Sequence, residues 1–165
     1  MRQKGFTLVE LLVALAVGVI LLTGLVLSIH NVVWGTGRSN SHVVALADVN
    51  LAALSLKKDI QMAQDTDLTD GDPIPQSAVT LTWTDYTGFE ESDNKTHYTT
   101  YTLYGTELHR DYDGTVSIVS RHITSVGFIQ NDRIVTVNIT ATGPGFLERI
   151  ETLKFSMQMR PEVAE

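Results

Sequence analysis

The chain has 165 residues, enough for one globular domain beside a membrane-spanning segment. With 12 Lys and Arg residues against 19 Asp and Glu residues, the formal net charge is −7. This acidic balance argues against nucleic acid as a partner, because phosphate backbones are bound by clustered Lys and Arg. The sequence contains no cysteine, which excludes both a disulfide framework and a thiolate metal site.

The chain begins with a short basic segment and a long apolar run. Arg2 and Lys4 precede Glu10, and no other formal charge occurs before Arg38. The uncharged run is long enough to cross a bilayer, since about 20 residues at about 1.5 Å each span the hydrocarbon core. We expect a membrane-spanning helix over residues 6–34. Its N-terminus should face the cytoplasm, because basic residues favour that side, and the rest of the chain should be extracytoplasmic.

Glu10 lies at the start of this apolar segment. A carboxylate in or near lipid is costly and requires a partner, so we treat it as a candidate functional residue. A cleavable secretory signal would need a shorter apolar core followed by a small-residue cleavage site. No such site follows this run, and the segment is therefore expected to stay attached to the protein.

Residues 4–15 read KGFTLVELLVAL and place a glycine, a phenylalanine and the acid directly after a basic residue. This arrangement resembles the prepilin leader of type IV pilins and type II secretion pseudopilins. The resemblance implies that prepilin peptidase removes residues 1–5 by cutting between Gly5 and Phe6, and that Phe6 is then N-methylated. It also implies that Glu10 forms an assembly salt bridge with the terminal amine of a neighbouring subunit. An ordinary signal anchor that carries the same residues is the alternative.

A weak stretch precedes a second helical segment. Residues 35–41 are rich in glycine and polar residues, which are poor helix formers, and form either a flexible joint or a weak part of a continuous helix. Beyond them, apolar residues spaced three and four apart form one stripe on a helix, with Asp48 and Asp59 off the stripe. The stripe consists of Leu46, Val49, Ala53, Leu56, Ile60 and Ala63. We expect residues 35–64 to continue the long helix and to pack this stripe on a sheet.

An acidic segment follows the helix. Asp65, Asp67, Asp70 and Asp72 fall within eight residues, next to Gly71. Calcium takes about six to eight oxygen ligands, and acids that alternate along a loop can supply several. The spacing of an EF-hand is not met, however. We favour a solvated loop that ends the long helix, with a calcium site at the four aspartates as the alternative.

The remaining residues, 65–165, are expected to form a β-rich globular domain. Apolar and polar residues alternate over 79–84, 135–141 and 153–160, the pattern of half-buried strands. Asp113-Gly114 is a strong hairpin signal. Further strands are expected at residues 97–103, 107–112 and 115–120. About six strands with short turns predict an antiparallel sheet with one face in water, and hence an α+β, pilin-like fold.

The sequence carries no motif of a hydrolase, a P-loop protein, a dinucleotide-binding protein or a zinc protease. We therefore expect neither enzymatic activity nor a cofactor. The one candidate for a zinc or catalytic site is His97 with His109, which a hairpin could bring together, and Asp111, which lies close in sequence. We favour exposed strand residues at these three positions.

Four short segments carry a narrower resemblance, to the J-type minor pseudopilin of type II secretion and to W-type minor pilins. The segments are Lys57–Ala63, Tyr101–Leu103, Leu108–Arg110 and Ile123–Phe128. The resemblance implies a minor subunit that initiates assembly. A major filament subunit and an adhesive pilin are the alternatives.

Taken together, these patterns predict a structural subunit of the cytoplasmic membrane that assembles into, or initiates, a type IV pilus or a type II secretion pseudopilus. Its expected partners are other pilin or pseudopilin subunits, contacted through the N-terminal helix, together with prepilin peptidase and the inner-membrane assembly platform. The alternative is a single-pass, membrane-anchored extracytoplasmic binding domain that does not polymerise. Glu10 distinguishes the two, because a simple anchor has no use for an acid at that depth.

Overall fold

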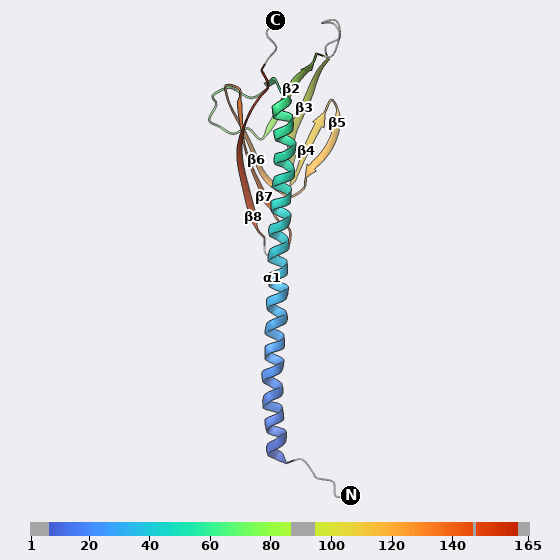
Figure 1. Ribbon diagram of the computed structural model, residues 1–165, viewed down its shortest axis with the longest axis vertical. Helices are drawn as coiled ribbons and strands as arrows, with labels where there is room; N and C mark the ends of the chain where they lie inside the picture. Colours follow the sequence, from blue (N-terminus) through green and yellow to red (C-terminus); the bar gives the residue numbers. More distant parts are fainter. Residues whose placement is uncertain (1–6, 87–94, 147, 162–165) are drawn as a thin grey trace.

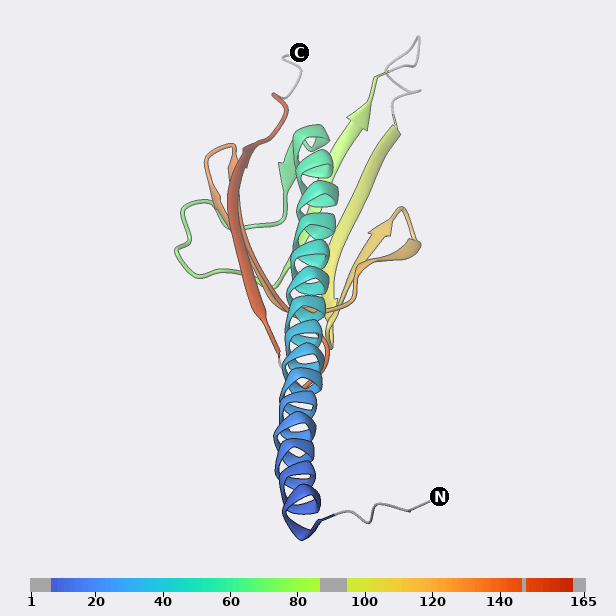
Figure 2. The same ribbon diagram turned by 60° about the horizontal axis from the view of Figure 1, so that its bottom comes forward.

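A computed structural model describes residues 7–86, 95–146 and 148–161 (Figure 1). One helix of 55 residues, α1 (Leu8–Met62), forms the long axis of the molecule, and its C-terminal half packs against β-sheets (Figures 1 and 2). The expected α+β fold, with a long N-terminal helix on antiparallel strands, is confirmed.

The helix runs through residues 35–41 without a break, so the flexible joint is the wrong alternative. Two observations explain why this glycine-rich stretch stays helical. Thr36 donates a hydrogen bond from its hydroxyl to the Val32 carbonyl at 2.8 Å, and Ser41, at the end of the stretch, is buried against the β-rich domain. Because helix formation is cooperative, the strongly helical segments on both sides keep the weak segment helical.

The strands form two antiparallel sheets, where the sequence predicted one. The first sheet has the order β1-β2-β3-β4-β5 and the second has the order β6-β7-β8. The strands of the first sheet are β1 (Asp65–Thr66), β2 (Ala78–Asp85), β3 (Lys95–Tyr104), β4 (Glu107–Tyr112) and β5 (Thr115–Ser120). The strands of the second are β6 (Ile123–Asn131), β7 (Ile134–Thr142) and β8 (Ile150–Gln158).

The sheets are separate because another segment occupies the outer edge of β6. Gln76 exchanges two backbone hydrogen bonds with Phe128, at 2.9 and 2.8 Å, and Asp70 bridges Gln130. The connection between β1 and β2 therefore pairs with β6 at the position where a neighbouring strand would join the two sheets. The helix lies across the divide, with one sheet on each side (Figure 2). Alternation within a strand could not reveal this division, because it does not show which edges pair.

The core lies between α1 and both sheets. Five of the six stripe residues are buried as predicted, whereas Leu46 is 45% exposed. Ala45 and Ala52 are buried as well, so the buried face is rotated toward small side chains, which let the helix approach the strands closely. The largest fully buried side chains are those of Tyr101, Phe128, Leu56, Ile60, Leu81, Leu108, Ile123 and Ile139.

The predicted hairpin at Asp113-Gly114 is confirmed. It joins β4 to β5, and both residues have positive φ angles, 49° and 85°. A type I′ turn requires positive φ at both central positions, which Asp and Gly tolerate better than other residues.

A clamp at the base of the domain holds the β7–β8 loop against the helix. A Cβ atom added to Gly143 would lie only 1.9 Å from the Ser41 carbonyl oxygen. The Arg149 amide donates to the Ser41 hydroxyl at 3.0 Å, and the Gly143 amide donates to the Arg149 carbonyl at 2.8 Å. Only glycine permits this close approach between loop and helix.

Changing Gly143→Ala should therefore destabilise the β-rich domain. The added methyl group must displace helix backbone, an overpacking that costs about 1–3 kcal/mol of the free energy of unfolding. Thermal unfolding of the full-length protein in detergent, followed by near-ultraviolet circular dichroism, measures the loss.

The matched control is Gly37→Ala, a helical glycine with no atom within 4 Å of an added Cβ. This change should be neutral or stabilising by up to about 1 kcal/mol, because alanine favours helix over glycine. Equal melting temperatures for Gly143→Ala and the wild type would contradict the clamp.

Candidate functional site: the N-terminal helix

The first half of α1 is apolar, and the other described residues leave it uncovered (Figure 1). No residue from 8 to 40 is buried, and large side chains around the whole circumference are exposed, for example Leu8 at 80%, Val17 at 50% and Ile20 at 70%. Among the described residues, α1 is the one helix long and apolar enough to cross a membrane. A helix that is apolar on all sides must be covered by lipid or by other helices.

Glu10 lies at the N-terminus of this helix and forms a capping box with Thr7. The Glu10 amide donates to the Thr7 hydroxyl oxygen at 3.3 Å, while Glu10 Oε2 accepts from the Thr7 amide and hydroxyl, both at 3.0 Å. A negative charge there also complements the positive end of the helix dipole. The capping box orients the carboxylate toward the start of the helix. This capping box was not predicted from the sequence, although the pattern T-x-x-E is a known signal for it.

Two of the candidate residues lie outside the described part of the chain. These are Gly5 and Phe6, which frame the predicted cleavage site, and the leader of residues 1–5 lies outside it as well. Cleavage and N-methylation at this position stay predictions.

Residues 1–26 match the family model described as "Prokaryotic N-terminal methylation motif". The matched segment contains Gly5, Phe6 and Glu10 and continues into the exposed apolar half of α1. The chain carries a prepilin-type N-terminus. No curated protein matches the chain.

Together with the long apolar helix, this motif supports a prepilin subunit of the pilin and pseudopilin type, held in the inner membrane by a single pass. It implies interaction with prepilin peptidase and with other pilin subunits. It also points to a structural subunit rather than an enzyme.

Asp59 fixes the C-terminal half of the helix on the first sheet. Its carboxylate accepts hydrogen bonds from the Tyr101 hydroxyl at 2.6 Å and from Arg110, through Nε at 2.6 Å and Nη2 at 3.2 Å. Asp59 is only 8% exposed. Burial, and then the hydrogen bond to Asp59, raise the pKa of Tyr101 above its ordinary range, and the hydrogen bond to Asp59 raises the pKa of Arg110. The cluster sets the rotation of the helix on the sheet.

Asp59 lies off the predicted apolar stripe, yet its side chain is buried, which the sequence pattern did not predict. The available signal was its position three residues after Leu56 and directly before Ile60, which puts it at the border of the apolar face. Asp48, the other acid assigned off the stripe, also contacts the β-rich domain. Its two oxygens contact the Ser120 hydroxyl at 2.8 Å and His122 Nδ1 at 2.6 Å.

The two candidate histidines are not brought together. His97 contacts Asp113 at 2.5 Å and stacks on Trp83 with ring centroids 4.4 Å apart. His109 lies opposite Thr102 on β3 and contacts Glu107 at 3.2 Å. Asp111 lies opposite Thr100. The three residues therefore form no joint site.

The four aspartates after the helix each accept a hydrogen bond from a backbone amide. Oδ1 of Asp65 and of Asp72 accepts from an amide one or two residues ahead, at 2.8 and 2.9 Å. Asp67 accepts from the Thr80 amide at 2.8 Å, and Asp70 from the Asp132 amide at 2.6 Å. The carboxylates thus serve different segments. Within the described residues, no three His, Cys, Asp or Glu side chains form a group that could hold a metal ion.

The raised pKa of Tyr101 predicts how stability depends on pH. The folded protein keeps the phenol proton at pH values where an unfolded tyrosine, with a pKa of about 10, loses it. The contribution of Tyr101 is therefore complete below about pH 10 and decreases as the pH rises further. Chemical unfolding at a series of pH values measures the slope.

The variant Tyr101→Phe should flatten that slope and lower stability at neutral pH by about 1.5–3 kcal/mol, since it removes a hydrogen bond to a charged group. The control is Tyr98→Phe, at a side chain that is 53% exposed, which should keep the wild-type slope. An unchanged slope in Tyr101→Phe would refute the assignment.

Proposed function

We propose that the chain is the precursor of a minor pilin or pseudopilin. It is cleaved between Gly5 and Phe6, N-methylated at Phe6, and built through α1 into a type IV pilus or a type II secretion pseudopilus, where it initiates or joins the filament. One observation carries this proposal: the prepilin-type motif lies on a helix whose apolar half is left uncovered by the chain's own domain.

The uncovered half of α1 has two successive environments in this proposal. Lipid surrounds it while the subunit waits in the cytoplasmic membrane, and the helices of neighbouring subunits surround it after assembly. Lipid tails are as apolar as leucine side chains, so this exchange gains little from the hydrophobic effect. Close packing and polar contacts must therefore decide whether, and in which register, a subunit docks.

Glu10 supplies the polar contact. A carboxylate near the membrane centre costs about 3 kcal/mol without a partner, and less near the edge. The amine of a processed Phe6 on a neighbouring subunit offers the complementary charge, and their attraction is strong because the surroundings are dry. The capping box with Thr7 holds the carboxylate at the end of the helix, which favours contact with another chain's terminus.

The Asp59 cluster supports a minor subunit of J or W type. Its three members, Asp59, Tyr101 and Arg110, belong to three of the segments that carry that narrower resemblance. The likeness therefore coincides with one connected set of contacts between helix and sheet, and is not scattered over the surface.

Processing should depend on Gly5. The peptidase must fit the residue before the scissile bond closely, and glycine has no side chain to clash. The variant Gly5→Leu should accumulate as a full-length, unmethylated precursor in the membrane. Mass spectrometry of the N-terminus measures this directly. An intact Met1 start on wild-type protein from assembled filaments would rule out the proposed cleavage.

Docking should depend on Glu10. The variant Glu10→Val should insert into the membrane and be processed, yet co-purify with partner pilins far less than the wild type. Thr23→Val is a suitable control, because the Thr23 hydroxyl bonds to the Val19 carbonyl of its own helix at 2.8 Å and has no need of a partner subunit. Undiminished incorporation of Glu10→Val would favour the membrane-anchored binding domain that does not polymerise.

A further inference from the structure

Four side chains gather where α1 emerges from its apolar half. We call them the basal patch: Trp34 and Arg38 of the helix, and Phe146 and Arg149 of the β7–β8 loop. Trp34 and Phe146 meet edge to face, with centroids 6.0 Å apart and an interplanar angle of 87°. A hollow of about 570 Å³ lies between helix and loop, and it is lined by Trp34 and Arg38 of the helix and by Glu148 and Arg149 of the loop.

Among the described residues of the β-rich domain, Phe146 is the most exposed large apolar side chain, at 91%. The β7–β8 loop that carries it is the part of this domain nearest the apolar half of α1 (Figures 1 and 2). The Ser41–Gly143 clamp holds the loop at this level of the helix. The phenyl ring is therefore presented at a fixed height beside Trp34, and its exposure to water is unfavourable.

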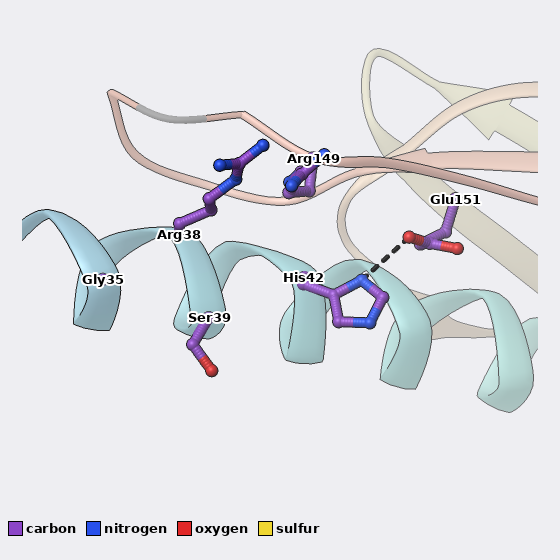
Figure 3. Close-up of a pocket in the computed structure, with 6 residues that line it drawn as sticks. All are labelled: Gly35, Arg38, Ser39, His42, Arg149 and Glu151. Carbon is purple, nitrogen blue, oxygen red and sulfur yellow. Dashed lines mark hydrogen bonds and ion pairs between the residues drawn. The ribbon is translucent and has the colours of Figure 1, made fainter.

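Among the described residues, the two arginines of the patch have no acidic partner. Figure 3 shows Arg38 and Arg149 on the same side of the helix, while His42 is paired with Glu151 at 2.8 Å. Within the part of the chain that the structure describes, neither guanidinium has a carboxylate within 4.0 Å. Glu148, which is adjacent to Arg149 in sequence, lines the same hollow as both arginines. Two unpaired arginines on a protein of net charge −7 form a site that favours an anion.

The length of the helix places this patch at a membrane surface. Glu10 and Trp34 are separated by about 36 Å along a helix that rises about 1.5 Å per residue. A bilayer has a hydrocarbon core of about 30 Å and a total thickness of about 40–45 Å with its head groups. If Glu10 lies at the inner edge of the core, Trp34 lies in the outer head-group layer. Arg38, one turn later, is then within reach of the lipid phosphates.

We propose that the basal patch binds the outer surface of the cytoplasmic membrane. Phe146 and Trp34 enter the head-group layer, and Arg38 and Arg149 bind the phosphates of anionic phospholipids. Aromatic rings concentrate at this level of a bilayer, and arginine extends its charged end toward the head groups. The proposal rests on the membrane-anchored subunit of the proposed function and needs no assembled filament. The contact holds the sheets in one orientation above the bilayer before assembly.

A spin label measures the depth of the loop. Because the chain has no cysteine, Phe146→Cys gives a single labelling site in the full-length protein. The labelled subunit is placed in vesicles of phosphatidylcholine with phosphatidylglycerol, without other subunits. At position 146 the label should collide more often with oxygen, which enters lipid, than with a water-soluble nickel chelate.

Two further labels complete the design. Val116→Cys, near the start of β5, is the matched control and should show the opposite preference, since Val116 is 59% exposed and β5 lies well above the lower end of the domain (Figure 1). Ile150→Cys, 66% exposed, reports on the patch with Phe146 intact. Its label should show intermediate oxygen access that falls when Phe146→Ser is added.

The charges are tested with Arg38→Gln and Arg149→Gln together, in a labelled Phe146→Cys background. The label should become at least twofold more accessible to the nickel reagent, and replacing phosphatidylglycerol by phosphatidylcholine should do the same in the parent. Equal nickel access at positions 146 and 116 would overturn the proposal. Protection of position 146 only after a partner pilin is added would also overturn it, in favour of a subunit contact. Both outcomes leave the proposed docking through Glu10 in place, because the Glu10→Val experiment tests that step separately.

Discussion

The uncovered apolar half of α1 determines where this protein can reside. Its side chains are exposed all around the helix, so the chain cannot remain a single soluble body. It must lie in lipid or among other helices. The prepilin-type motif begins this same segment, and Glu10 is its one formal charge before Arg38. Glu10 is therefore important because it is the one charge within an apolar segment, and its contacts within its own subunit are secondary.

The second half of α1 ties this element to the sheets. Asp59 fixes the helix on the first sheet through Tyr101 and Arg110, and the Ser41–Gly143 clamp fixes it at the base of the second. Because the helix is continuous between its two halves, a displacement of the apolar half is transmitted to the sheets. When a subunit docks through its helix, the position of its two sheets is therefore fixed as well.

The sequence predicted most of the helix and strands because their signals are periodic and local. Membrane length, the stripe around Leu56 and the Asp113-Gly114 turn each depend on neighbours in the chain. The division into two sheets escaped prediction because it depends on Gln76 pairing with Phe128, a contact between distant segments. Asp59 escaped for the same reason, since its partners lie on β3 and β4. The capping box of Thr7 and Glu10 was local and could have been found.

Photo-cross-linking from Val17 identifies what covers the apolar half of α1. Val17 is 50% exposed, in the middle of the apolar half, and a photo-reactive phenylalanine derivative at this position samples whatever covers the helix. In cells that produce partner prepilins, we expect an adduct with another prepilin-type subunit, and we expect that adduct to be lost when Glu10→Val is added. Absence of that adduct, or its persistence with Glu10→Val, would contradict docking of the helix through Glu10.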